Sequence, residues 1–196
     1  MKVIIFPGVG FHKDLTKYNA FADKIKEGCG CDVTTFCWKH DWPLPDTKLP
    51  VVAARKWICE VILDFQQVIR HAIEMEVPEA DIYIGHSAGS VLALVQNKPC
   101  IIFGSPAVLV EIAQSKENMP KVELLKAFKN DNRKVFNIIN KYDQLAYELT
   151  WSSVENYIYA GKTFSFNTYN PLAAHSDYWK NAKIIQAIIN KINQWK

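Results

Sequence analysis

The pattern that most constrains the fold is an alternation of short apolar runs with longer stretches whose apolar residues recur at helical spacing. The runs at residues 2–6, 82–84 and 100–103 are apolar almost throughout and too short for helices, which is typical of strands buried on both faces. Strands that alternate with helices form parallel sheets, because parallel neighbours need a long crossover connection. We therefore predict an α/β fold, with a mostly parallel sheet and helices on both faces, in a single domain over residues 1–196.

The remaining elements follow from the same periodicities. Further strands are expected at residues 32–38 and 134–140, and a strand or hairpin at residues 157–169. Helices are expected at residues 15–25, 51–76, 87–96, 107–130 and 176–195. In sheets of this kind, sites lie at the carboxyl ends of the strands, so the segments that follow strands are where functional residues are expected.

The segment after the strand at residues 82–84 is Gly85-His86-Ser87-Ala88-Gly89, which fits the pattern G-x-S-x-G. A serine at a sharp strand-to-helix turn has a strained backbone, and side chains two residues before or after it would clash. The helix that follows would direct free N–H groups toward the serine, where they can stabilise an oxyanion. The motif alone occurs by chance in many chains, so the rest of the site has to support it.

A nucleophilic serine needs a histidine to take its proton, and the histidine needs a carboxylate to orient it. His175 is the only histidine beyond the motif, and it lies between the last predicted strand and the last predicted helix. Asp143 follows the strand at residues 134–140. We therefore predict a catalytic triad of Ser87, Asp143 and His175, in the chain order of α/β hydrolases.

Each assignment has an alternative. Asp143 could serve only as a helix N-cap, and His175 only as a cap of the terminal helix. Rival acids are Asp131, which precedes its strand, and Asp177, which is very close to His175 in sequence. His86 adjoins the serine and is expected to point away from it.

The predicted oxyanion hole combines the backbone N–H of Ala88 with one from the turn at residues 7–10. Val9 is the preferred donor there, with Gly10 or Phe11 as alternatives, and the glycines of this turn could also serve only to make it tight. Aromatic residues on or beside predicted loops could form an apolar substrate pocket. They are Phe11, Trp38, Trp42, Tyr147 and Trp151.

With these residues the chain resembles the α/β-hydrolase superfamily, and in particular its small esterase-like and lipase-like members. The resemblance covers essentially the whole chain in element order, and its specific residues are the motif at 85–89, Asp143 and His175. Members often have His-Gly after the first strand, where this chain has Pro7-Gly8. The region at residues 107–133, where members insert a cap, is short here, which implies a minimal fold with little or no cap.

The resemblance implies a serine hydrolase that cleaves a carboxylic ester or thioester through an acyl-enzyme intermediate, without a metal or another cofactor. Its partner would be a small-molecule ester or thioester. Two alternatives stay open, because fold does not determine function. One is a non-catalytic binding protein on the same scaffold, and the other is an acyltransferase that uses the same triad.

The composition argues against several other classes. A net charge of +3, without clusters of basic and aromatic residues, does not favour a nucleic-acid partner. No apolar run approaches the roughly 18 residues of a membrane span, and no signal peptide is recognisable, so a cytoplasmic location is expected. The five cysteines are an odd number and lack zinc-site spacing, which favours reduced thiols.

Overall fold

The computed structural model describes residues 1–8, 15–38, 76–108, 133–143, 145–161, 174–175 and 177–196. The strands are β1 (Lys2–Phe6), β2 (Asp32–Thr35), β3 (Ile82–His86), β4 (Cys100–Phe103), β5 (Val135–Asn140) and β6 (Val154–Tyr159). The α-helices among these residues are α1 (Thr16–Cys29), α3 (Ala88–Val95) and α7 (Ala182–Trp195), and a 3₁₀ turn, η2, spans Asp177–Lys180.

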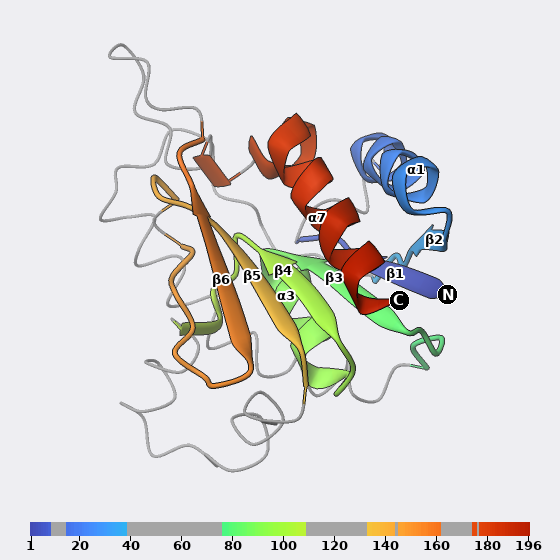
Figure 1. Ribbon diagram of the computed structural model, residues 1–196, viewed down its shortest axis with the longest axis horizontal. Coiled ribbons are helices and arrows are strands. Elements are labelled where there is room, and N and C mark those ends of the chain that lie inside the picture. Colours follow the sequence, from blue (N-terminus) through green and yellow to red (C-terminus); the bar gives the residue numbers. More distant parts are fainter. Residues whose placement is uncertain (9–14, 39–75, 109–132, 144, 162–173, 176) are drawn as a thin grey trace.

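The six strands form one sheet in the order β2-β1-β3-β4-β5-β6, and every neighbouring pair is parallel. The chain therefore steps from β1 to one side for β2 and to the other side for β3 and all later strands (Figure 1). Loops that leave the carboxyl ends of β1 and β3 diverge at this reversal, which is where open α/β sheets form their sites.

Two apolar layers cover the sheet. Helices α1 and α7 pack on one face and α3 on the other, as Figure 1 shows. The buried side of α1 is spaced at helical intervals and consists of Tyr18, Phe21, Ala22, Ile25 and Cys29. The helix ends at Gly30, whose φ of 63° lets its N–H bond the carbonyl of Lys26. The predicted parallel α/β sheet with helices on both faces is thus confirmed.

The predicted boundaries differ most near the carboxyl terminus. The segment predicted as one helix over residues 176–195 consists of η2 and then α7, because Asn181 has an extended backbone and caps α7 through a bond from Lys183 N–H. Strand β6 begins before the predicted start and pairs in parallel with β5, so the described part is a strand and not a hairpin. Nearly all of the predicted helix at residues 51–76, and most of that at 107–130, lies outside the described residues.

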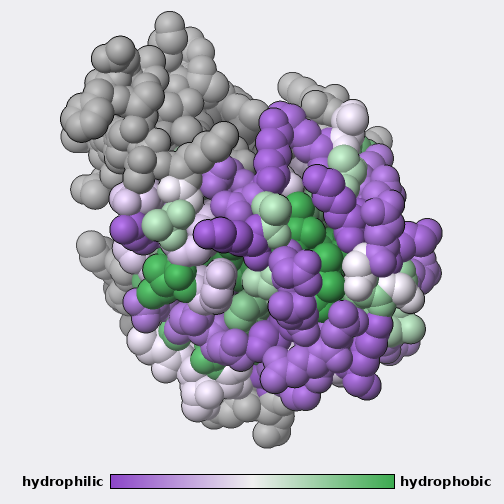
Figure 2. Space-filling model, turned by 45° about the horizontal axis from the view of Figure 1, so that its top comes forward, coloured by the Kyte–Doolittle hydropathy of each residue, from purple (hydrophilic) through white to green (hydrophobic). Residues whose placement is uncertain are grey.

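The described surface is mainly hydrophilic in the view of Figure 2, with hydrophobic residues visible in small areas between hydrophilic ones. The exposed large hydrophobic side chains of the described residues are few, namely Met1, Tyr147 and Ile158. In the described part of the chain, no helix has the length and apolar character that a membrane crossing requires.

Candidate active site at the strand ends

Ser87 lies directly after β3 in a strained backbone conformation, with φ 52° and ψ −125°. The two glycines of the motif are required by close backbone contacts. A Cβ on Gly85 would lie 2.4 Å from the carbonyl oxygen of Gly89, and a Cβ on Gly89 would lie 2.2 Å from the carbonyl oxygen of Phe6. The turn is held from the side by a bond from Ser87 N–H to Phe103 O at the end of β4, 3.1 Å long. The motif therefore forms the tight strand-to-helix turn that the sequence predicted.

His175 and Asp143 form a buried hydrogen-bonded pair. His175 Nδ1 lies 2.9 Å from Asp143 Oδ2, and the two residues are 8% and 5% exposed. Asp143 belongs to the turn after β5, where its Oδ1 accepts from Leu145 N–H, so this aspartate both shapes the turn and orients the histidine. The rival Asp177 accepts from Asn181 Nδ2. The other rival, Asp131, lies outside the described residues.

The surroundings of Asp143 keep it ionised. Burial by itself raises the pKa of this carboxyl. The neighbouring His175, the Leu145 N–H and the Tyr178 hydroxyl outweigh burial and hold the pKa below its ordinary value. Tyr178 Oη donates to Asp143 Oδ2 over 2.9 Å and accepts from Asn140 N–H, also at 2.9 Å. An ionised carboxylate with three donors fixes the ring of His175 with Nδ1 toward Asp143 and leaves Nε2 for another partner.

Ser87 and His175 each contact one of two adjacent residues at the end of β4, Phe103 and Gly104. Ser87 N–H bonds Phe103 O, and a Cβ on Gly104 would lie 3.1 Å from Cε1 of His175. The predicted hydrogen bond between Ser87 Oγ and His175 Nε2 is not formed among the described residues. Bonds of this type often tighten only when substrate is bound.

The turn after β1 packs directly on the motif. A Cβ on Gly8 would lie 3.0 Å from the Cβ of Ser87. Ala88 is the first residue of α3, so its N–H has no acceptor within the helix. Val9, the other predicted oxyanion donor, lies outside the described residues, as do Phe11 and Trp42.

Trp38 was predicted to line the substrate pocket. It is 7% exposed in the apolar layer beside α3, and its indole N–H donates to Pro7 O over 2.8 Å. In the described structure this tryptophan therefore supports the turn after β1.

No protein-family profile matches this chain, and no curated protein matches it in sequence. Solved structures do resemble it. Alpha/beta hydrolase domain-containing protein 10 from mouse matches with a TM-score of 0.53 at 12% identity, over 98% of this chain and 88% of that one. An esterase domain from a Rhodothermus marinus protein matches with a TM-score of 0.50 at 12% identity, over 99% of this chain and 85% of that one.

The chain has the α/β-hydrolase fold. Its strand order, its reversal at β1 and β3, and the strained serine at the end of β3 are the features that define a site in this scaffold. The short described sheet with helices on both faces agrees with the predicted minimal version of the fold.

Sequence reasoning missed two residues that support the acid. Tyr178 and Asn140 are both buried, and the Asn140 side chain also donates to Ala174 O, next to His175, over 3.2 Å. A polar residue at the carboxyl end of a buried strand was a usable signal for Asn140. Tyr178 had no comparable signal, because an aromatic residue near a helix is most often part of the core.

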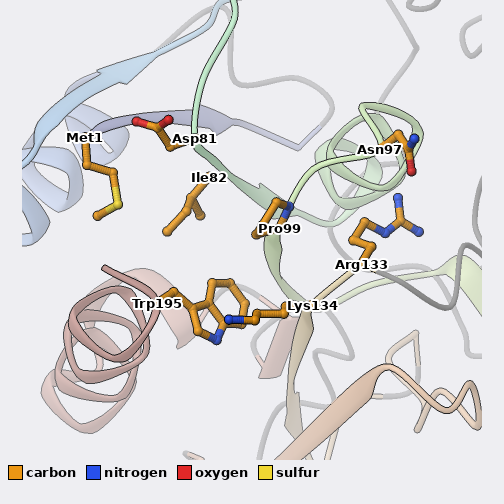
Figure 3. A pocket seen from close by; sticks show the side chains of 8 residues that line it. All are labelled: Met1, Asp81, Ile82, Asn97, Pro99, Arg133, Lys134 and Trp195. Carbon is orange, nitrogen blue, oxygen red and sulfur yellow. The ribbon is translucent and has the colours of Figure 1, made fainter.

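A cavity of about 280 Å³ lies at the opposite edge of the sheet (Figure 3). Its lining includes Met1, Asp81, Pro99 and Lys134, which precede β1, β3, β4 and β5 respectively. This cavity is therefore at the amino ends of the strands, away from Ser87. Within the described ranges, no group of three or more His, Cys, Asp or Glu residues is placed to hold a metal ion.

Proposed function

We propose that the chain is a serine hydrolase that cleaves a carboxylic ester or thioester of a small molecule, with Ser87 as the nucleophile. The observation that carries the proposal is the buried pair of His175 Nδ1 and Asp143 Oδ2, 2.9 Å apart, at the same sheet edge as a strained serine. A structural ion pair alone would not require the serine next to it to adopt a costly backbone conformation.

In the proposed first half-reaction, Ser87 Oγ attacks the carbonyl carbon while His175 Nε2 takes the hydroxyl proton. Asp143 stays ionised and stabilises the imidazolium ion that forms, which its lowered pKa favours. The tetrahedral intermediate then collapses, the bond to the leaving oxygen or sulfur breaks, and His175 protonates the leaving group. The acyl group is now bound to Ser87.

In the second half-reaction, His175 takes a proton from water, and the hydroxide attacks the acyl carbon. The intermediate collapses with release of the carboxylic acid, and the proton returns to Ser87 Oγ. The developing oxyanion would be bound by Ala88 N–H, at the start of α3, and by an N–H of the turn after β1, for which Val9 remains our prediction. Each such donor is worth roughly 10²–10³-fold in kcat in enzymes of this kind.

The test is covalent labelling with a fluorophosphonate probe, followed by assays on p-nitrophenyl esters and acyl thioesters. Wild-type protein should be labelled, Ser87→Ala should not, and Ser152→Ala, which changes an exposed serine, should be labelled as the wild type is. Asp143→Asn should fold, yet react much more slowly, because the amide favours the wrong tautomer of His175.

The outcomes separate the alternatives. A folded wild type that takes no label and cleaves no ester or thioester would contradict the proposal and favour a binding protein on the same scaffold. Labelling of Ser87 with release of acyl product to an added alcohol or amine, in preference to water, would identify an acyltransferase.

A further inference from the structure

His86, the residue before Ser87, is buried on the α1/α7 face of the sheet. His86 is 1% exposed, and its ring lies between aromatic groups of the α1/α7 face. The ring centroids of Trp179 and His175 are 4.8 and 4.9 Å away, and that of Phe103 is 5.3 Å away. This orientation follows from the alternation of side chains along β3, because Ile82 and Ile84 face the same layer.

One ring nitrogen of His86 is bonded to the main chain of the proposed base. His86 Nε2 lies 3.0 Å from the carbonyl oxygen of His175. A carbonyl oxygen can only accept, so Nε2 carries the proton and Nδ1 is the acceptor in a neutral ring. The residue adjacent to the nucleophile therefore holds the backbone of the residue that is to take the nucleophile's proton.

The other ring nitrogen connects to the turn after β1. Tyr18 Oη lies 3.5 Å from His86 Nδ1 and accepts from Gly8 N–H at 3.2 Å. Since Gly8 N–H can only donate and an unprotonated Nδ1 can only accept, the bond between Tyr18 and His86 is one that the hydroxyl donates. A Cβ on Gly8 would lie only 3.2 Å from His86 Nδ1, so the turn and the imidazole are in direct contact. Hydrogen bonds thus run in one direction from Gly8 through Tyr18 and His86 to His175.

We propose that His86 is a positioning residue, which sets the placement of the His175 main chain and, through Tyr18, of the oxyanion turn relative to Ser87. This inference rests on the proposed hydrolase function. The nucleophile, the base and the oxyanion turn come from segments far apart in the sequence. The His86 side chain, next to Ser87, contacts the main chain of His175 and also contacts Tyr18, which is hydrogen-bonded to Gly8 in the oxyanion turn.

The protonation state of His86 suits this role. Burial, and next the neighbouring His175, lower the pKa of His86 to about 3. Burial also keeps the pKa of Tyr18 well above its ordinary value, so its hydroxyl remains a donor. His86 therefore stays neutral at the pH at which His175 would act, and it does not compete for the serine proton.

The experiment compares His86→Met with His86→Gln. Methionine fills a similar volume without a donor, whereas the glutamine amide can still donate to the His175 carbonyl. We expect His86→Met to lower kcat, and the rate of fluorophosphonate labelling, by about 100-fold, the effect of a misplacement of about 1 Å, with KM changed much less. His86→Gln should recover at least about 10-fold of that loss. Urea unfolding of both variants ensures that only folded protein is compared.

A second readout does not depend on activity. Nitrogen-15 spectra of the histidine rings should show His86 protonated at Nε2, with Nδ1 unprotonated, and unchanged down to about pH 4, as its low pKa requires. If His86→Met does not fold, Tyr18→Phe replaces it, and it should lower kcat by removing the link to Gly8.

The inference and the proposed function fail in different ways. A wild type that is labelled, with His86→Met labelled at the same rate, overturns the inference and leaves the hydrolase proposal intact. The inference is also overturned if His86→Gln recovers none of the activity lost in His86→Met, or if the spectra show the His86 ring protonated at Nδ1. A folded wild type that is not labelled overturns the hydrolase proposal, and the inference with it.

Discussion

Replacing Tyr178 with phenylalanine tests how Asp143, the candidate acid, is held in place. Tyr178 is 0% exposed, and its hydroxyl is bonded on both sides, donating to Asp143 and accepting from Asn140 N–H. Phenylalanine keeps the ring and its packing. The variant therefore removes two hydrogen bonds and leaves one buried N–H without this acceptor.

The magnitude follows from these two bonds. A hydrogen bond to a charged group contributes about 1.5–3 kcal/mol, and an orphaned buried donor costs about 1–3 kcal/mol. We expect the free energy of unfolding of Tyr178→Phe to fall by about 3 kcal/mol at pH 7, within the usual margin of a domain that still folds. Urea unfolding followed by circular dichroism measures it.

The loss should depend on pH. The folded-state pKa of Asp143 is lowered, so its contribution to stability is present above the unfolded pKa of about 3.9 and is lost as the pH falls through the folded pKa. Removal of one donor raises the folded pKa toward the unfolded value. The difference between wild type and variant should therefore shrink as the pH falls below the unfolded pKa and through the folded pKa, where the carboxyl becomes protonated.

A matched control is Tyr159→Phe. Tyr159 is 8% exposed, its ring lies 5.7 Å from that of Tyr178, and its hydroxyl is buried without a hydrogen-bond partner among the described residues. Its loss should change stability by less than about 0.5 kcal/mol, or stabilise the protein. Equal losses in the two variants, or a Tyr178→Phe loss below about 1 kcal/mol, would refute the reasoning.

Two further predictions concern the motif around Ser87. Ser87→Gly should be at least as stable as Ser87→Ala in urea unfolding, because a φ of 52° strains any residue with a Cβ by about 1 kcal/mol or more. At the exposed Ala20 of α1 the same change from alanine to glycine should cost about 1 kcal/mol, and a similar cost at both positions would contradict the strain. Gly89→Ala should abolish folding or cost several kcal/mol, because its Cβ would overlap the Phe6 carbonyl oxygen, 2.2 Å away. A Cβ on Gly30 would have no atom within 4 Å, so Gly30→Ala should cost only about 1 kcal/mol, for the positive φ of this residue. Comparable losses of stability in Gly89→Ala and Gly30→Ala would show that steric overlap does not cause the loss at Gly89.

Local pattern was sufficient to predict most of the sheet. β1 and β4 have the bounds that were predicted, because both strands are buried on both faces and, apart from Lys2 at the start of β1, are apolar throughout. β6 was harder to locate, since it is an edge strand of mixed burial in which apolar and polar residues do not alternate regularly. The terminal helix was predicted too long because helical periodicity continues through η2, and only the extended backbone of Asn181 separates the two.

The sequence by itself determined the tight turn at Ser87 with its two glycines. It also determined the end of the sheet at which the candidate acid and base, Asp143 and His175, lie. These properties depend on residue type and on neighbours within a few positions. The tertiary structure alone decided which distant groups meet: the bond from Asp143 to Tyr178, and the contacts of His86 with the His175 carbonyl and with Tyr18. These partners are 35, 89 and 68 residues apart. Periodicity reports which face of an element is buried, whereas the order of strands and the packing of α1 and α7 determine what that face touches.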